Sequence, residues 1–580
     1  MTSPSATLSP KRLALYNFNI GRLMGLRVNR YSWWTHAREL ADYFLPRRYK
    51  WIVTPNQAYR GSPINQHILD ETGVICARNL ASGLVSGKSS PTRPWFKLRV
   101  GKIDSTQTSP VSLWLAECER LLYLIFSESN FYNCISTFYF DLVVFGTAVL
   151  LIYEDYDNVI NCYNPCFGEY YVDIDGQYRP RIFYREFTMT VDAVVNRWGY
   201  ENCSISVQSL YDDRSGANRT REIIVAHAVE PNTVDDAFKF GISPKWTFRE
   251  SYWEWGGSTS PQGGAPGQGA GFLYVGGFYE QMAIIGRWDL VSNDAYGRSP
   301  AMDALPAQKQ IQLEQRRKAQ AIDKMVNPPL VADMQLKNQP ASLLPGGITY
   351  VSGYTTSGKP GFSSVYDTKF PVNDIVEDLK EVYQRISKTF FNDVLMTASQ
   401  FETRSNVTAM EWDMRRAESM VLLGPALERI DYEVLGPTID RVFAIASRIP
   451  GFLPPAPAEI AGQMITVDYV SMLSQAQKAA AAGGIERLAQ FAGTLEGIKP
   501  GTMDNVDTDE MIEEYSNLLN NKPKLIRSPE ELKQIREAAQ QAQQQAQQAA
   551  MAEQLSKSAK NLSDVNLGGG QPAAQQIGVQ

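Results

Sequence analysis

Residues 301–329 have the sequence AMDALPAQKQIQLEQRRKAQAIDKMVNPP, and this stretch decides the fold. After an early proline, residues 301–326 have a composition that suits one long helix, about 37 Å long at 1.5 Å per residue. Asn327-Pro328-Pro329 ends the helix because proline lacks an N–H donor and restricts the residue before it. A glycine- and proline-punctuated insert follows, and helical apolar spacing returns at 372–392. Two helices around an irregular insert indicate a helical hairpin that buries too little surface alone.

Helical texture continues beyond the hairpin. After the polar stretch 393–406, the capping box Thr408-Ala-Met-Glu411 opens a helical region that extends to about Ser447. Gly424-Pro425 and Gly436-Pro437 lie inside that region. Each proline removes one backbone donor, so we expect each to kink or split the helix.

The C-terminal region has a biased composition. Residues 538–552 comprise seven Ala, seven Gln and one Met, types that tolerate a helix but provide no apolar face. Pro529, followed by two glutamates, is a good helix start. We expect a helix over 526–555, ordered only by neighbours, and a disordered tail over 556–580.

The first half alternates between helical and strand texture. Helical spacing predicts helices over 10–45 and 67–90, and helical structure continues over 110–145. The uncharged stretch 256–271 indicates a flexible loop between two strands. Turn signals separate the predicted strands, which are 148–153, 170–175, 181–187, 221–229, 245–255 and 272–279. The fold class is therefore α+β, mainly helical.

Composition narrows the class of protein. The 580 residues are 44% hydrophobic and 20% charged, which excludes collagen-like, disordered and disulfide-stapled chains. The longest uncharged apolar run, 142–153, is too short for a bilayer, which needs about 20 residues. The N-terminus lacks the layout of a secretory signal, and the six cysteines are scattered, so we expect a soluble chain in a reducing compartment.

Charge is distributed unevenly. The net charge is −6, yet residues 1–100 carry 15 Lys/Arg against 4 Asp/Glu, whereas residues 101–290 carry 13 against 24. An acidic total argues against a protein that coats nucleic acid. The basic segment is interpreted as a solvated face balanced by the acidic segment; contact with phosphates or an acidic partner is the alternative.

No catalytic constellation is found. Gly83-Leu-Val-Ser-Gly87-Lys88-Ser89 has three residues between its glycines, where a phosphate-binding P-loop needs four, and it follows helical rather than strand texture. Cys162 and Cys166 form no paired metal motif. The acidic pairs Asp155/Asp157 and Asp173/Asp175 are interpreted as turn carboxylates, with a hard cation as the alternative. We therefore expect that the chain is not an enzyme and that it needs no cofactor.

Five strings together resemble the head-to-tail connector, or portal, family of short-tailed bacteriophages (podoviruses). They are ILDETGVICARNLASGLVSGKSSPTRPWFKL at 68–98, YGRSPAMDALPAQKQ at 296–310, NPPLVAD at 327–333, LPGGITYV at 344–351 and VTAMEWDMRRAESMVLLGPALERIDYEVLGPTIDRVFAIASRIPGFLPPAP at 407–457. The resemblance covers roughly residues 10–500 in unbroken order.

The resemblance implies a twelve-subunit ring at one capsid vertex, through which double-stranded DNA is packaged and later ejected. The parts it implies are a wing body at 1–290, stem helices at 291–326 and 373–392, a clip at 327–372, a tunnel loop at 393–406, a wing helix at 407–447, a crown at 448–525, a barrel helix at 526–555 and a disordered tail at 556–580. It implies as partners the terminase, tail adaptors, major capsid and scaffolding proteins and, as a further candidate, internal ejection proteins. It implies that the protein is made in the host cytoplasm and is located at the portal vertex of the virion.

Candidate site residues follow from these parts. Candidates for contact with DNA in the channel are Gln400, Phe401, Glu402, Thr403, Arg404, Arg316, Arg317 and Lys318; for the last three, an intersubunit or solvent-facing cluster is an equal alternative. Candidates for the clip surface that faces terminase or tail are Asp333, Lys337, Tyr350, Tyr354 and Lys359. Two alternatives remain open, a nucleotide-driven motor subunit and another ring adaptor of the tail.

Overall fold

The computed structural model describes residues 9–48, 68–100, 110–255, 272–326, 330–332, 362–364, 372–392, 423–460, 465–469, 472–496, 506–518 and 529–564. The fold is α+β and mainly helical, as the sequence predicts. The chain divides into two compact units. The first comprises residues 1–96, 121–453 and 469–473, and the second comprises 97–120, 454–468 and 474–580.

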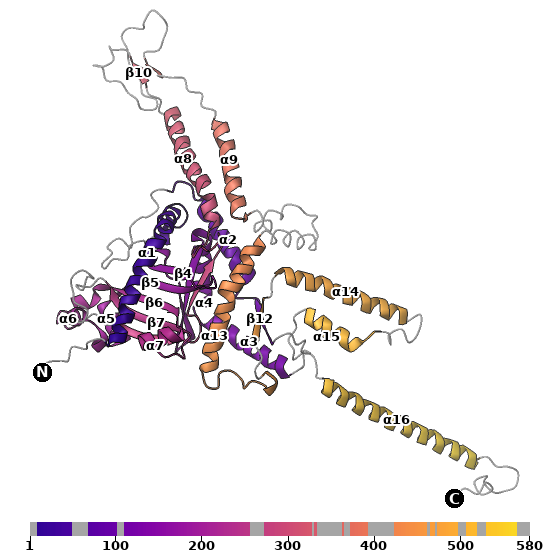
Figure 1. Cartoon of the computed structure of the whole chain (residues 1–580). Coiled ribbons are helices and arrows are strands. Elements are labelled where there is room, and N and C mark those ends of the chain that lie inside the picture. The colour runs from indigo at the N-terminus through magenta and orange to yellow at the C-terminus, as the bar shows by residue number, and fades with distance from the viewer. Residues whose placement is uncertain are drawn as a thin grey trace, which may run out of the picture. The chain divides into compact units, whose positions relative to one another are not determined.

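The first unit contains most of the helices (Figure 1). They are α1 (Pro10–Phe44), α2 (Thr72–Lys88), α4 (Phe131–Phe145), α5 (Val191–Trp198), α6 (Ile205–Tyr211), α7 (Val234–Phe240), α8 (Pro300–Val326), α9 (Val372–Thr389), a π-helical turn (Asp431–Leu435) and α13 (Gly436–Arg448). Helix α3 (Pro110–Glu128) begins in the second unit and ends in the first.

The two largest antiparallel sheets among the described residues lie in the first unit. The larger has the strand order β4-β5-β6-β7-β8, and the smaller has the order β3-β2-β9. Their bounds are β2 (Thr147–Asp155), β3 (Val159–Tyr163), β4 (Tyr170–Ile174), β5 (Pro180–Thr190), β6 (Glu222–Pro231), β7 (Phe248–Trp255), β8 (Phe272–Phe278) and β9 (Ala283–Arg287). The six predicted strands are confirmed; β3 and β9 are short and were not predicted.

Each face of the five-stranded sheet is covered, because successive side chains of a strand point to opposite faces. On one face Phe187, Val225 and Tyr252 pack with the valines of α5 and with Val207 of α6. On the other face Tyr184, Ala226 and Trp253 pack against Leu23 and Leu26 of α1. The sheet therefore forms the buried centre of this part of the unit.

The predicted helical region over 110–145 is confirmed, but it is divided into two helices. Helix α3 ends at Glu128 and α4 begins at Phe131. Asn130 lies at the break, where its side chain accepts the Cys162 N–H at 2.8 Å and donates to the Cys162 carbonyl at 2.9 Å. The bonds to a distant strand fix the asparagine outside the helix, which periodicity along the chain cannot reveal.

The helical region after residue 423 continues through its second proline. Residues 423–430 are helical, the π turn follows, and Pro437 lies in the first turn of α13. A π turn shifts the hydrogen-bond register, so the missing proline N–H does not break the helix. The expected irregularity is thus a π turn rather than a split. The capping box at 408–411 lies outside the described residues.

The second unit is described separately. It contains most of the strand pair β1 (Phe96–Val100) and β12 (Ile465–Tyr469), most of helix α14 (Met472–Glu496), and the helices α15 (Thr508–Leu518) and α16 (Pro529–Asp564). Helix α16 begins at the predicted Pro529 and extends past residue 555, so residues 556–564 are helical rather than part of a tail. Helix-tolerant residues continue to Asp564, and the first glycine after it is Gly568.

Candidate functional site

The string Gly83–Ser89 is the C-terminal end of a helix. Helix α2 ends at Lys88, and the Lys88 Nζ lies 2.6 Å from Asp431 Oδ2. Burial raises the pKa of Asp431, whereas the Lys88 ammonium lowers it. A P-loop needs a loop between strand and helix that presents backbone N–H groups to phosphate. Lys88 instead forms a partly buried ion pair that joins α2 to the π turn.

Cys162 is buried, and the carboxylates of Asp173 and Asp175 contact groups of the same chain. Cys162 lies buried in β3, where burial raises the pKa of its thiol. Asp175 Oδ1 accepts the N–H groups of Gln177 and Arg179, and Asp173 is paired with Arg22 at 2.8 Å. The interpretation of Asp175 as a turn carboxylate is confirmed. Within the described ranges, no three His, Cys, Asp or Glu side chains are grouped as metal ligands.

Helices α8 and α9 lie side by side as a hairpin (Figure 1). Strand β10 (Leu330–Ala332) follows α8 and pairs antiparallel with β11 (Phe362–Ser364), which precedes α9. The pairing brings together the two ends of the insert between the helices. The helical hairpin predicted from residues 301–329 is therefore present.

A polar network holds the hairpin to the start of α2. Asp70 Oδ2 accepts the Tyr383 hydroxyl at 2.8 Å and Gln315 Nε2 at 3.2 Å, and Asp70 Oδ1 accepts the Thr72 N–H at 2.9 Å. Gln312 accepts the Leu69 and Asp70 N–H groups at 2.6 and 2.9 Å. One short segment thus binds both hairpin helices and the first turn of α2.

Apolar side chains complete this base. Leu379, Val382, Ile386 and Phe390 are spaced along one face of α9 and are at most 2% exposed. Phe390 packs edge-on against Phe44 at the end of α1, with ring centroids 5.7 Å apart. We call Asp70, Gln312, Gln315, Tyr383 and this apolar face the stem base.

The candidate channel residues are only partly described. Arg316 and Arg317 are exposed on α8, and Lys318 beside them is half-buried. Gln400, Phe401, Glu402, Thr403 and Arg404 lie outside the described residues, as do Asp333, Lys337, Tyr350, Tyr354 and Lys359.

A buried ion pair joins the smaller sheet to the π turn. The Arg287 guanidinium donates to Glu433 Oε1 at 2.5 Å, and the Arg287 N–H donates to Oε2 at 3.0 Å. Both side chains are about one-twentieth exposed, at 4% and 6%. Gly286 permits this approach, because a Cβ there would lie 2.5 Å from Val434 Cγ2. The π turn places a carboxylate where the straight periodicity of a helix would not predict one.

A second buried polar group crosses the five-stranded sheet. Arg185, His227 and Tyr252 are register partners on β5, β6 and β7. The His227 ring stacks on Tyr252 with centroids 4.0 Å apart, and His227 Nε2 lies 2.9 Å from Glu250 Oε1. Burial raises the pKa of Glu250 to about 7, although Arg197 and Arg185 lower it. Burial lowers the pKa of His227, and Arg185 lowers it further.

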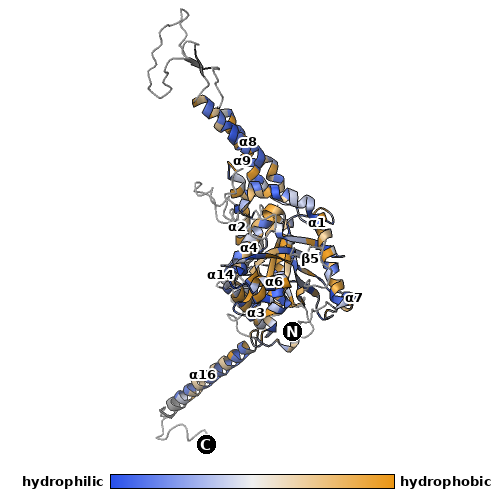
Figure 2. Cartoon of the chain, turned by 90° about the vertical axis from the view of Figure 1, so that its left-hand side faces the viewer, coloured by the Kyte–Doolittle hydropathy of each residue, from blue (hydrophilic) through white to orange (hydrophobic). Residues whose placement is uncertain are grey.

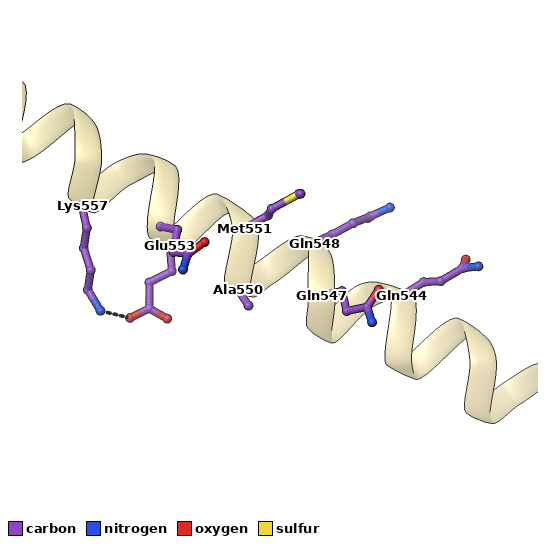
Figure 3. A pocket seen from close by; sticks show the side chains of 8 residues that line it. Gln544, Gln547, Gln548, Ala550, Met551, Glu553 and Lys557 are labelled. Atoms are coloured by element: carbon purple, nitrogen blue, oxygen red, sulfur yellow. Dashed lines mark hydrogen bonds and ion pairs between the residues drawn. The ribbon is translucent and has the colours of Figure 1, made fainter. Parts of the chain in front are cut away.

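The hollow beside α16 is one side of an exposed helix (Figure 3). Its lining residues all come from α16 and are all exposed: Gln544, Gln547, Gln548, Ala550, Met551, Glu553, Gln554 and Lys557. Lys557 Nζ pairs with Glu553 Oε1 at 2.8 Å. Without a second wall the hollow cannot enclose a small molecule, but its glutamine- and alanine-rich turns are suited to packing against another helix.

Comparison with known proteins decides the family. Residues 19–526 match the family described as bacteriophage head to tail connecting protein. The chain belongs to this family. It is 36% identical over 512 residues to a "Probable portal protein" of Bordetella phage BPP-1, covering 88% of this chain and 89% of that protein. It is 34% identical over 546 residues to a "Portal protein" of Salmonella phage epsilon15, covering 94% of each.

Sequence reasoning about this connector protein missed the groups that hold its parts together. The Asp70 network and the Arg287–Glu433 pair each join residues more than 140 positions apart. Asp70 lies in one of the strings that carry the family resemblance, which is the one signal that could have drawn attention to it. Among the described residues, no helix combines the length and apolarity needed to cross a bilayer.

Proposed function

We propose that the chain is the portal subunit of a bacteriophage, and that twelve copies form a ring at one capsid vertex. Double-stranded DNA would enter through the ring during packaging and leave through it during ejection. The observation that carries the proposal is the family match over residues 19–526, together with two relatives named as portal proteins. The α8–α9 hairpin supports it, because the base of this hairpin is built by its own chain and the outer half is exposed.

A structural role fits the chemistry better than catalysis. Lys88, the only lysine of the P-loop-like string, is engaged with Asp431 at the end of a helix. Energy for packaging would therefore come from a separate ATP-hydrolysing terminase that docks on the clip, residues 327–372. The ion pair between Lys88 and Asp431 weighs against the alternative of a nucleotide-driven motor subunit. The other alternative, a ring adaptor of the tail, is disfavoured by the names of both relatives.

The acidic composition suits a conduit. Twelve copies with a net charge of −6 would carry about −72, so much of the wall would repel phosphates. Each neutralised phosphate would add salt-dependent affinity and slow the passage of DNA. We propose that the segment 393–406 lines the narrowest part, with Phe401 and Arg404 as its DNA contacts.

Helix α16 is proposed to form a barrel inside the ring with its eleven copies. Its residues 531–558 are almost all exposed, and its central turns carry Ala and Gln instead of charges. Charged helices repeated at short distance around an axis would repel one another, whereas this surface would not. The barrel would guide DNA or seat internal ejection proteins. The other partners would be the major capsid, scaffolding and tail adaptor proteins at the vertex of a virion assembled in the host cytoplasm.

Crosslinking in filled particles tests the DNA path. A cysteine introduced at Phe401 and coupled to a short photoreactive group is expected to crosslink to packaged DNA. A cysteine at Lys359, in the proposed terminase-facing segment, is the matched control and is expected to crosslink weakly. Strong crosslinks from position 359 and none from 401 would overturn the placement of the constriction.

A further inference from the structure

The outer half of α8 has a basic surface. Residues 316–324 carry four cations and one acid, a net charge of +3. Arg317 and Lys324 are seven residues apart and both exposed, so they share one face with the exposed Leu313. Arg316 is exposed beside them. We call Arg316, Arg317 and Lys324 the basic stem face.

The outer half of α9 has the opposite charge. Residues 374–381 carry four acids and one cation, a net charge of −3. Glu377, Asp378 and Glu381 are exposed. Glu377 and Glu381 lie on the side of the helix away from the buried Leu379, Val382 and Ile386, and Asp378 lies at the edge of that side. We call these three residues the acidic stem face. Figure 2 shows hydrophilic and hydrophobic colours mixed along the hairpin, where α8 and α9 overlap in this view.

The two faces lie at the same height along the hairpin. Helices α8 and α9 pack together, and hydrogen bonds from Gln315 to Tyr383 and from Arg385 to Gln310 fix their register. Arg316 and Arg317 on α8, and Glu381 and Asp378 on α9, follow these contacts in the direction of the insert between the two helices. Among the described residues, no ion pair of 4.0 Å or less joins the basic face to the acidic face.

Rotation about one axis keeps every copy at the same height. A head-to-tail contact between adjacent hairpins therefore brings complementary groups together only if those groups are level within one chain. The hairpin meets this condition, because residues 316–324 of α8 carry a net charge of +3 and residues 374–381 of α9 carry a net charge of −3. We propose that the basic stem face of one subunit binds the acidic stem face of the adjacent subunit, a second copy of this chain.

This inference rests on the proposed ring and changes the role of Arg316 and Arg317. They were candidates for DNA contact; here they position subunits instead. Ion pairs between exposed side chains contribute little singly, but a ring repeats the set at every interface. Such contacts weaken with ionic strength, because the Debye length falls from about 10 Å at 0.1 M to about 3 Å at 1 M salt.

Charge reversal on the full-length chain tests the proposal. Variant A carries Arg316→Glu, Arg317→Glu and Lys324→Glu, and variant B carries Glu377→Lys, Asp378→Lys and Glu381→Lys. Each variant has like charges on both faces. We expect each alone to need at least tenfold more protein than wild type for half-assembly, measured by mass photometry in 0.1 M salt.

An equimolar mixture of A and B is the decisive arm. Every A–B contact then pairs an acidic face with a basic face, so alternating rings are expected at the wild-type concentration. A DNA-binding role for Arg316 and Arg317 predicts instead that variant A assembles normally and fails only to bind duplex DNA. Normal assembly of A alone, or failure of the mixture to assemble, would overturn the proposal.

Two controls separate the possible failures. Reversal of three exposed cations outside the stem, Arg214→Glu, Arg221→Glu and Lys245→Glu, should leave assembly unchanged. Circular dichroism of A and B should match wild type, because the substituted residues are exposed and tolerate a helix. If wild type itself forms no ring, the proposed function fails; if wild type and variant A both form rings, only this inference fails.

Discussion

The stem base and helix α16 are both helical, yet one is completed within its own chain and the other is not. At the stem base, Val382 and Ile386 are fully buried, and Asp70 accepts hydrogen bonds from three other residues. In α16, the residues from Glu531 to Lys557 are exposed almost without exception. Isolated helices with no apolar face are marginal in water. The difference indicates which parts a subunit folds by itself and which parts depend on neighbours.

The buried body should respond most strongly to substitution. Glu433→Gln removes the charge that Arg287 contacts and leaves a buried guanidinium without its counter-ion. Breaking a buried pair costs about 3–5 kcal/mol, so the free energy of unfolding should fall by that amount in urea denaturation. The double variant Arg287→Met/Glu433→Leu is the control and should recover part of the loss. A loss under 1 kcal/mol for Glu433→Gln would mean that the pair is solvated.

The stem base should show the next largest effect. Asp70→Ala removes the acceptor of Tyr383, Gln315 and the Thr72 N–H, and hydrogen bonds to a charged group contribute about 1.5–3 kcal/mol. We expect a loss of about 2–3 kcal/mol and faster amide hydrogen exchange in α9. Asp70→Asn, which retains one side-chain oxygen, is the matched control and should lose less. Unchanged exchange in α9 would show that its apolar face suffices.

The sheet core should add a pH dependence. Burial raises the pKa of Glu250 to about 7, from an ordinary value near 4.5, so the folded state favours the protonated acid. The stabilisation is complete below about pH 4.5 and is lost as the pH rises to 7 and above, by about 3 kcal/mol. Glu250→Gln should therefore reduce the change of the thermal unfolding midpoint with pH between pH 5 and 8. The buried His227 acts in the other direction, because its lowered pKa costs stability as the pH falls below about 6.5.

Glu119 controls for that experiment. Its pKa is also raised to about 7 by burial, and it lies in the second unit, where it accepts the Leu98 N–H at 2.7 Å. Glu119→Gln should leave the Glu250 contribution in place. A profile that flattens with Glu119→Gln and not with Glu250→Gln would move the pH dependence to the second unit.

Helix α16 should show the smallest effect within one chain. Gln544→Glu with Gln548→Glu changes two exposed side chains, and such surface substitutions alter stability by about 0.5 kcal/mol or less. In the proposed barrel the same change would repeat around the axis and loosen α16, which hydrogen exchange of residues 532–550 would record. The neutral pair Gln544→Ala with Gln548→Ala is the control. Equal exchange in both variants would contradict the barrel.

The sequence predicted the parts of this comparison better than the contacts between them. Apolar spacing and Pro-Pro punctuation located α8 and α9, since these signals lie within one element. The break at Asn130 and the π turn at 431–435 depend on partners in distant strands, Cys162 and Arg287. The spacing of apolar residues within one element does not predict contacts with distant strands. The same limit explains why Asp70 was not predicted as the residue that holds the hairpin.

The candidate site residues divide in a similar way. Arg316 and Arg317 were identified from local charge, and their exposure on α8 agrees with a surface role. Which partner they meet depends on what lies level with them on α9, and that information comes only from the hairpin register. Phe401 and Arg404 remain predictions from the family resemblance.

The mass of the purified full-length particle tests the central claim most directly. Mass photometry at micromolar concentration should show one closed species near twelve times the 64.9 kDa mass of the chain, with no series of intermediate sizes. The stem base and the sheet core would be formed in every copy, and the exposed charged and Gln/Ala surfaces would be covered by neighbours. A stable folded monomer at that concentration would contradict the account.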